Sequence, residues 1–113
     1  MNNLRNRVLL IGRLGAQPET KTLANGSTLT RFNLATSESY KNDKGERITD
    51  TQWHNITTWG KVAELAAQLL DKGKEVVVEG KLVSRAYTDK DGVKRYVTEI
   101  VANDLLLVGA KAQ

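Results

Sequence analysis

A single segment of this chain has a helical hydrophobic period, and it separates two stretches that are rich in β-prone residues. Residues 60–73 read GKVAELAAQLLDKG, in which Gly73 is a natural C-terminal stop. One stripe of the predicted helix carries five apolar side chains, namely Val62, Leu65, Ala66, Leu69 and Leu70. The chain is therefore predicted to be mainly β, with one helix connecting two β-rich halves.

The half before the helix begins with two strand-forming regions. Residues 4–14 are strand-like, and Gly12 and Gly15 allow a bend or bulge there. Residues 19–37 form a predicted hairpin around Asn25-Gly26, the dipeptide that a type I′ turn prefers. One strand and one hairpin with a tight turn are therefore expected in this region.

A polar stretch and one more strand complete this half. Residues 37–51 are the most polar part of the chain and are expected to form a long exposed loop or the tip of an extended hairpin. Residues 51–59, TQWHNITTW, are β-prone and run directly into the predicted helix.

The second half is β-rich throughout. Residues 74–109 contain Asp91-Gly92, which predicts another tight turn between two strands. Five strands with one helix between the third and the fourth is the element order of the OB-fold, a five-stranded Greek-key barrel. We expect one such domain over residues 1–113, since the chain is too short for two ordinary domains.

Composition narrows the function classes. The chain has no cysteine, which excludes a disulfide scaffold and a thiolate metal site. The apolar run at residues 8–11 is too short for a signal peptide, so a cytoplasmic protein is expected. A net charge of +4 and a pI near 9.5 are compatible with a polyanionic partner.

Both tryptophans lie on residues 51–59. Because side chains alternate along a strand, Trp53 and Trp59 share one face with Asn55 and Thr57, about 20 Å apart at roughly 3.4 Å per residue. A face that is aromatic at both ends and polar between is expected to be half-exposed. Taken alone, this strand fits either a packing or subunit-contact role or a role in stacking.

Cationic residues accompany the aromatic residues. Lys61 follows Trp59, and Arg85 precedes Tyr87 by two positions. This interleaving suits single-stranded nucleic acid, because bases stack on aromatic rings while lysine and arginine meet the phosphates. Duplex hides the base faces, which predicts a preference for single strands.

No catalytic, cofactor or metal site is predicted. His54 is the only histidine, and a lone histidine without cysteine cannot form a standard zinc site. Neither Gly60-Lys61 nor Gly73-Lys74 has the glycine spacing of a Walker A loop. The chain is therefore expected to be a binding protein and not an enzyme.

Several blocks resemble one family in order and spacing. The residues RVLLIGRLGAQPE, NLATSESY, WHNITTWGKVAELA, VVVEGKLVSRAYTD and RYVTEIVAN resemble successive blocks of the bacterial single-stranded DNA-binding protein family. The resemblance implies an OB-fold homotetramer that wraps single-stranded DNA without strong sequence preference. It also implies protection of that DNA during replication, recombination and repair, in a bacterial cytoplasm and associated with the nucleoid.

The resemblance also carries residue roles. The family's stacking aromatics fall on Tyr40, Trp53, Trp59 and Tyr87, although tryptophan is commoner at the first and last of these positions and phenylalanine at the third. The family's phosphate-contacting positions fall on Arg7, Lys21, Lys61, Lys72, Arg85 and Arg95. A family histidine near the subunit interface matches His54.

One departure limits what the resemblance carries. Family members usually continue into a flexible linker and an acidic tip that recruits replication and repair enzymes, whereas this sequence stops at VGAKAQ. Recruitment of those enzymes is therefore not carried over from the resemblance to this sequence. Two other functions remain open at this point, an OB-fold interaction module such as a primosome accessory subunit and an RNA-binding OB domain.

Overall fold

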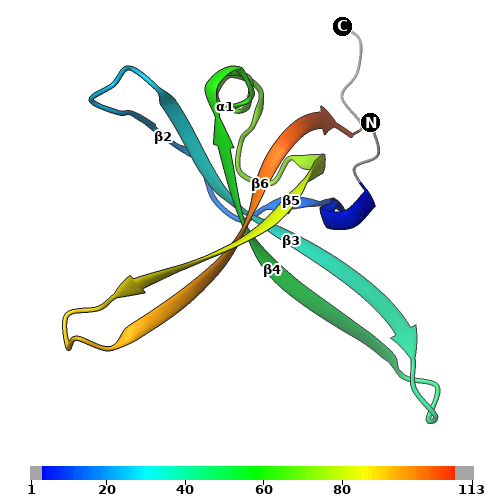
Figure 1. The fold of residues 1–113 in the computed structure, drawn as a ribbon. Helices are drawn as coiled ribbons and strands as arrows, with labels where there is room; N and C mark the ends of the chain where they lie inside the picture. Colours follow the sequence, from blue (N-terminus) through cyan, green and yellow to red (C-terminus); the bar gives the residue numbers. More distant parts are fainter. Residues whose placement is uncertain (1–3, 109–113) are drawn as a thin grey trace, which may run out of the picture.

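The computed structural model of the chain describes residues 4–108, which form one sheet, one α-helix and one short 3₁₀ helix (Figure 1). The elements in chain order are η1 (Leu4–Asn6), β1 (Val8–Leu14), β2 (Glu19–Thr22), β3 (Thr28–Lys41), β4 (Arg47–Trp59), α1 (Gly60–Leu69), β5 (Glu75–Thr88) and β6 (Lys94–Leu107).

The sheet closes into a barrel. Its strand order is β1-β5-β6-β4-β3-β2, and an additional pairing of β1 with β3 joins the two sides. The contact between β4 and β6 is parallel, whereas the other pairings are antiparallel. Because β2 pairs only with β3, the other five strands form the closed ring, which confirms the predicted OB-fold with β2 as an extra short strand.

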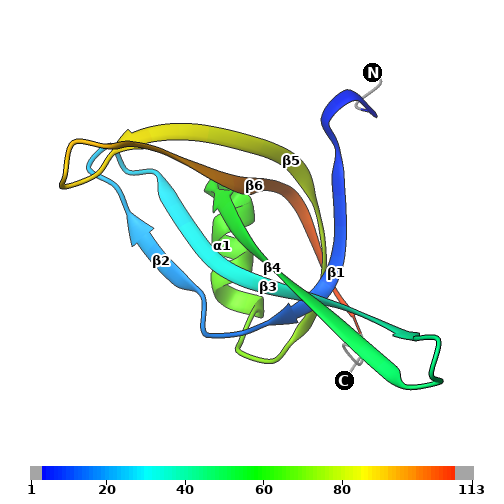
Figure 2. The same cartoon turned by 90° about the horizontal axis from the view of Figure 1, so that it is seen from below.

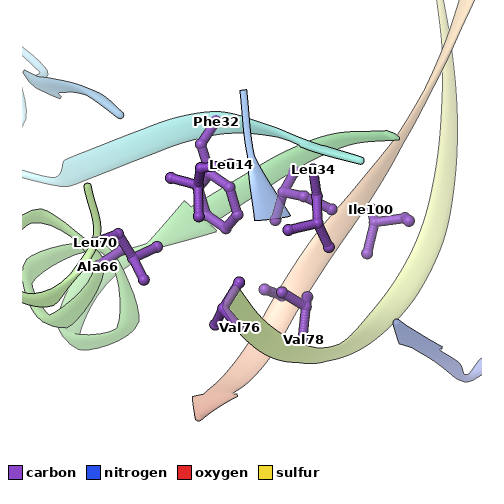
Figure 3. Close-up of a cluster of buried hydrophobic side chains, with 10 residues drawn as sticks. Leu14, Phe32, Leu34, Ala66, Leu70, Val76, Val78 and Ile100 are labelled. Carbon is purple, nitrogen blue, oxygen red and sulfur yellow. The ribbon is translucent and has the colours of Figure 1, made fainter. Parts of the chain in front are cut away.

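The core lies inside this ring. Inward-facing side chains of β3, β4, β5 and β6 alternate with outward-facing polar residues, as a sheet with one buried face requires. Figure 3 shows the cluster, in which Leu34, Val76 and Val78 are fully buried. At about 1.5–3 kcal/mol for each large apolar side chain removed from water, this cluster is the main source of stability.

The helix covers one end of the barrel, with only part of its predicted face (Figure 2). Ala63 and Ala66 are buried, whereas Leu65 and Leu69 are exposed. Small side chains allow the helix to approach β3 closely enough for Thr30 Oγ1 to donate a 2.9 Å hydrogen bond to the carbonyl oxygen of Ala63. The predicted apolar stripe was therefore right for Ala66 and Leu70, which lie in the core, and wrong for Leu65 and Leu69, because close approach to β3 buries the small side chains of the helix instead.

The helix also ends before the predicted stop. It closes at Leu69, and the N–H of Leu70 donates to the carbonyl oxygen of Ala66. Gly73 has a φ of 86° and its N–H donates to the carbonyl oxygen of Leu14. This glycine therefore ties the turn after the helix to the end of β1 instead of capping the helix.

Two long hairpins extend beyond the barrel in different directions (Figure 1). The first, here the β3–β4 arm, consists of residues 37–51, so the alternative of an extended hairpin tip was right and a loop was not. The second, here the β5–β6 arm, consists of residues 82–100. Both arms expose most of their side chains, because they have no second layer to pack against.

The hairpin turns differ from the predicted type I′. At Asn25-Gly26, only Gly26 has a positive φ, of 87°, whereas type I′ requires it at both central residues. The N–H of Leu23 donates to the carbonyl oxygen of Ser27, and the N–H of Gly26 donates to the carbonyl oxygen of Leu23. These bonds enclose a three-residue loop that ends in a glycine of left-handed conformation. The tips of both arms repeat this pattern with Gly45 and Gly92.

The chain begins differently from the prediction as well. Leu4–Asn6 is a 3₁₀ turn, so the first strand starts at Val8 and not at residue 4. The Asn6 side-chain amide donates to the carbonyl oxygen of Leu82 and accepts from its N–H, both at 3.0 Å. One asparagine side chain thereby replaces strand pairing at this edge of β5.

The expectation drawn from VGAKAQ falls mostly on residues 109–113, which lie outside the described residues. Among residues 4–108, the single α-helix is too short and too polar to span a membrane.

Candidate nucleic-acid interface

The outer face of β4 carries the predicted aromatic and polar row. Trp53 is 61% exposed and Trp59 is 44% exposed, with Asn55 exposed between them. Ile56 and Thr58, on the alternate positions, are buried in the core. The predicted division of this strand into two faces is confirmed except at Thr57, which was expected on the half-exposed face and is buried. Both indoles are available to a ligand.

The Trp53 indole occupies space that is free because Gly15 has no side chain. A Cβ atom placed on Gly15 would lie 2.5 Å from Cζ3 of Trp53, which is closer than such atoms approach in proteins. The Trp53 ring therefore lies directly over the backbone of Gly15, just after β1. Gly15 was predicted only to allow a bend, and its role under an aromatic ring has no signal in the local sequence.

A groove runs from this face of β4 to the β5–β6 arm. It is lined by Arg31, Phe32, Asn33, Asn55, Ile56, Thr57, Arg85, Val97 and Glu99. Glu99 joins its two sides, since it accepts a 2.9 Å hydrogen bond from Thr57 Oγ1 and forms an ion pair with Arg85 at 3.4 Å. The groove thus presents two asparagine amides, the guanidinium groups of Arg31 and Arg85 and the Glu99 carboxylate.

Tyr87 lies on the same side of the β5–β6 arm as the groove-lining residues Arg85, Val97 and Glu99, and this side is here called the groove face. It is 48% exposed and shares a face with Arg85, two positions before it. Its cross-strand neighbour Arg95 donates to Asp89 Oδ2 at 2.8 Å. That hydrogen bond, helped by the N–H of Val93, lowers the pKa of the Asp89 carboxyl below its ordinary 3.8.

Tyr40 does not join this face. Pairing between β3 and β4 continues without a break from Ala35↔Trp53 to Tyr40↔Ile48. Because five positions separate Trp53 from Ile48, Tyr40 and Trp53 point to opposite sides of the hairpin. Tyr40 is 56% exposed and lines a shallow hollow with Ser39, Lys41 and Arg47.

The predicted phosphate contacts divide into two groups. Arg7, Arg85 and Arg95 are each ion-paired, with Glu79, Glu99 and Asp89 respectively. Lys21, Lys61 and Lys72 are exposed, and none of them belongs to an ion pair formed within residues 4–108.

Their positions also differ. Lys21 lies beside Leu29, the cross-strand neighbour of Trp59, and Lys61 follows Trp59 by two residues. Arg7 instead lines a separate hollow, together with Arg5, Asn6, Glu79, Gly80, Lys81 and Asn103. The structure therefore places the first two lysines near the groove face but does not place Arg7 there.

His54 is half-buried on the opposite side of β4 from Trp53. Its Nε2 forms a 3.0 Å hydrogen bond with Thr36 Oγ1 on β3. In the part of the chain that the structure describes, no group of three or more histidine, cysteine, aspartate or glutamate side chains could hold a metal ion.

Sequence reasoning missed an exposed aromatic residue. Tyr96 is 70% exposed, more than any of the four predicted stacking residues, and the Lys94 ammonium stands 5.7 Å from its ring centroid. The run Lys94-Arg95-Tyr96 repeats the pairing of cation and ring at Tyr40-Lys41, which could have drawn attention to it.

A closed five-stranded barrel of this topology, with aromatic, amide and cationic side chains on its outer surface, defines an OB-fold protein. The chain belongs to the Single-strand binding protein family, whose family model matches residues 5–108.

Individual relatives agree with this assignment. The single-stranded DNA-binding protein of Neisseria meningitidis serogroup B is 45% identical over 106 residues, which cover 94% of this chain and 61% of that protein. Single-stranded DNA-binding protein 1 of Chlorobaculum tepidum is 46% identical over 107 residues, 94% of this chain and 66% of that protein. The chain thus spans about two thirds or less of the length of these relatives.

Solved structures share the fold. A Plasmodium falciparum SSB in complex with ssDNA matches with a TM-score of 0.82 and 32% identity, over 96% of this chain and 99% of that chain. A deletion mutant of the single-stranded DNA binding protein from Thermus aquaticus matches with a TM-score of 0.80 and 29% identity, over 94% and 51% of the two chains.

Proposed function

We propose that this chain binds single-stranded DNA with little sequence preference and protects it during replication, recombination and repair, without catalysing a reaction. The observation that carries the proposal is the pair of exposed indoles, Trp53 and Trp59, on a strand face that opens onto a groove with arginine and asparagine side chains. The names of the relatives and the SSB–ssDNA complex support the same ligand.

The mechanism divides between stacking and charge. Bases stack on Trp53, Trp59 and Tyr87, at roughly 1–3 kcal/mol per base whatever the sequence. Lys21 and Lys61, whose charges have no ion-pair partner within residues 4–108, meet phosphates near Trp59. Tyr40 takes part from the other side of the β3–β4 arm, so the DNA contacts more than one face of the protein.

The chain acts as a homotetramer in the cytoplasm. Support comes from an apolar row across β1, β5 and β6, where Ile11, Val77 and Leu106 are register neighbours and Ile11 and Leu106 are more than half exposed. Within the described chain, the outer edge of β1 pairs with β3 only at Arg13 and Leu14, which leaves the edge of Val8–Gly12 open to another copy.

We propose that His54 lies near such a subunit contact. Light scattering on the purified chain tests the assembly, and a monomeric mass at working concentration would refute it.

Intrinsic tryptophan fluorescence tests the binding function directly. Oligo-dT should quench the emission strongly and in a salt-sensitive way, and duplex of equal length should not, because stacking requires exposed base faces. Oligo-rU of equal length should quench more weakly than oligo-dT. Stronger quenching by the RNA would favour the RNA-binding alternative, and quenching by no nucleic acid would favour the interaction module.

Two substitutions locate the site. Trp53→Ala and Trp59→Ala should each weaken binding of oligo-dT by about 1–3 kcal/mol and leave the fold intact, because neither side chain belongs to the buried core. Leu65→Ala, on the exposed face of α1, is the matched control and should bind normally. Normal binding by both tryptophan variants would show that the DNA lies elsewhere.

A further inference from the structure

The β5–β6 arm has a second exposed face, opposite the groove face. Tyr87 and Arg95 are cross-strand partners on the groove face, whereas Ala86 and Tyr96 are partners on the other side. Both sides are open because the arm extends beyond the barrel (Figure 1). We call the second side the reverse face, and its residues are Leu82, Ser84, Ala86, Thr88, Lys94, Tyr96 and Thr98.

Charge distinguishes the two faces. On the groove face, Arg85 is paired with Glu99 and Arg95 with Asp89, so both guanidinium charges are compensated within the arm. The reverse face contains no carboxylate. Lys94 belongs to none of the ion pairs formed within residues 4–108, and its ammonium stands 5.7 Å from the Tyr96 ring centroid.

The side chains of the reverse face suit an anionic ligand with a flat apolar part. Tyr96 offers a ring that is 70% exposed, and Lys94 offers an uncompensated charge beside it. Ser84 Oγ and Thr98 Oγ1, which share a 3.1 Å hydrogen bond, lie between Tyr96 and Leu82. This hydroxyl pair interrupts the apolar surface that a protein partner would need to bury, whereas a nucleotide tolerates it.

We propose that Tyr96 and Lys94 form an additional subsite for single-stranded DNA, with a base stacked on the ring and a phosphate beside the ammonium. The subsite is occupied by a second segment of a strand that also lies on the groove face and has passed round the edge of the arm. The proposal rests on the proposed binding of single-stranded DNA. It adds that a strand must exceed a minimum length before the reverse face contributes.

Strand length provides the test, with affinities of Tyr96→Ala measured against two oligo-dT ligands. One ligand has about 6 nucleotides and the other is several times longer than the roughly 16 nucleotides at the upper end for one OB fold. Tyr96→Ala should lose about fivefold or more in affinity for the long strand, from the loss of one stacked base, and stay within about twofold for the short one.

Control variants separate stacking from other effects. Tyr96→Phe keeps the ring and should bind both strands as the unmodified chain does. Tyr87→Ala, on the groove face, should weaken binding of both strands. The particle mass of Tyr96→Ala is measured in parallel, because a change in assembly would show that the reverse face contacts another copy and would overturn the proposal.

A fluorescent variant gives a direct reading. In a chain carrying Trp53→Phe and Trp59→Phe, Tyr96→Trp introduces the only indole, and the long strand should quench it while the short one should not. Quenching by neither strand, or unchanged long-strand affinity in Tyr96→Ala, overturns the subsite and leaves the binding function standing. Failure of the unmodified chain to bind either strand overturns the proposed function itself.

Discussion

The two arms have the same length scale and the same turn geometry, yet they differ in how their charges are arranged. The β3–β4 arm has an unbroken ladder of cross-strand pairs and is braced by hydroxyl pairs such as Ser39 and Thr49. The β5–β6 arm starts from a register shift at Glu79/Gly80 and is braced by the Arg85–Glu99 and Arg95–Asp89 ion pairs.

The two arms therefore differ in which of their cations are available to a ligand. Lys41, Lys44 and Arg47 on the β3–β4 arm belong to none of the ion pairs formed within residues 4–108 and remain available to a polyanion. The groove-face arginines of the β5–β6 arm already hold carboxylates, which fixes the shape of the arm. The contrast lies in the pairing of individual cations and not in net charge, since residues 37–51 also carry Glu38, Asp43, Glu46 and Asp50. Each unpaired cation of the first arm should therefore contribute more to phosphate binding than each paired arginine of the second, which forms a fixed groove wall.

The largest expected effect is a loss of folding stability caused by a substitution at the register shift. A Cβ atom on Gly80 would lie 2.2 Å from the carbonyl oxygen of Val101, so Gly80→Ala must displace backbone where β5 leaves the barrel. We expect a loss of stability at the upper end of the roughly 1–3 kcal/mol typical of overpacking, measured by urea denaturation.

The β3–β4 arm supplies the matched control for that substitution. Gly45 has a φ of 79° and open space around it, and asparagine tolerates this conformation, so Gly45→Asn should cost less than about 1 kcal/mol. Equal losses in the two variants would mean that the register shift absorbs a side chain and does not constrain the second arm.

Much of this architecture was predictable because alternation and turn residues are local signals. The parity of residues 51–59 placed Trp53 and Trp59 on one exposed face, and the single helical segment fixed the element order. The buried face of the helix was predictable only in part, since Ala63 is buried where the helix approaches β3 and accepts a hydrogen bond from Thr30, 33 positions away. The local hydrophobic period contains no information about how closely the helix packs against a distant strand.

The candidate site shows the same limit. Aromatic residues were visible in the sequence, but the side of the arm on which Tyr40 lies depends on the register of β3 with β4. Likewise, Arg85 and Arg95 were predicted as phosphate contacts from resemblance, while their carboxylate partners emerge only from cross-strand pairing. Pairing register, and not residue type, decides which cations are uncompensated.

A smaller effect is expected on the salt dependence of DNA binding, which compares unpaired and ion-paired cations of the two arms. Lys41→Gln and Arg47→Gln should each reduce the slope of log affinity for oligo-dT against log salt by about 0.7, the value for one phosphate contact on a single strand. Arg95→Gln should reduce it less, because Asp89 already neutralises part of the Arg95 charge. The measurement is a salt titration of binding for each variant.

Equal slopes would remove the contrast between the arms. If Arg95→Gln changed the salt dependence as much as Lys41→Gln, Asp89 would have to release the guanidinium when DNA binds. The ion pair would then be a resting-state contact and not a fixed brace of the groove wall.

The smallest expected effect concerns the two tips and their response to acid. Asp89 Oδ1 accepts from the N–H groups of Asp91 and Val93, whereas Asn42 Oδ1 accepts from those of Lys44 and Glu46. The Arg95 hydrogen bond lowers the pKa of Asp89 in the folded state, so its contribution is present above the ordinary value of 3.8 and is lost as the pH falls through the lower folded value. The amide of Asn42 does not titrate.

Backbone order at the two tips, measured by ¹⁵N relaxation while the pH is lowered, reads out this difference. The N–H of Val93 should lose part of its order as the pH falls through the folded pKa of Asp89, which lies below 3.8, because the neutral carboxyl accepts more weakly and no longer holds Arg95. The N–H of Glu46 should keep its order, since its acceptor, the Asn42 amide oxygen, carries no ionisable proton. Asp89→Asn should abolish the pH dependence at Val93, because the amide does not titrate. A parallel loss of order at both tips would instead indicate general acid unfolding, and the contrast between a carboxylate acceptor and an amide acceptor would not hold.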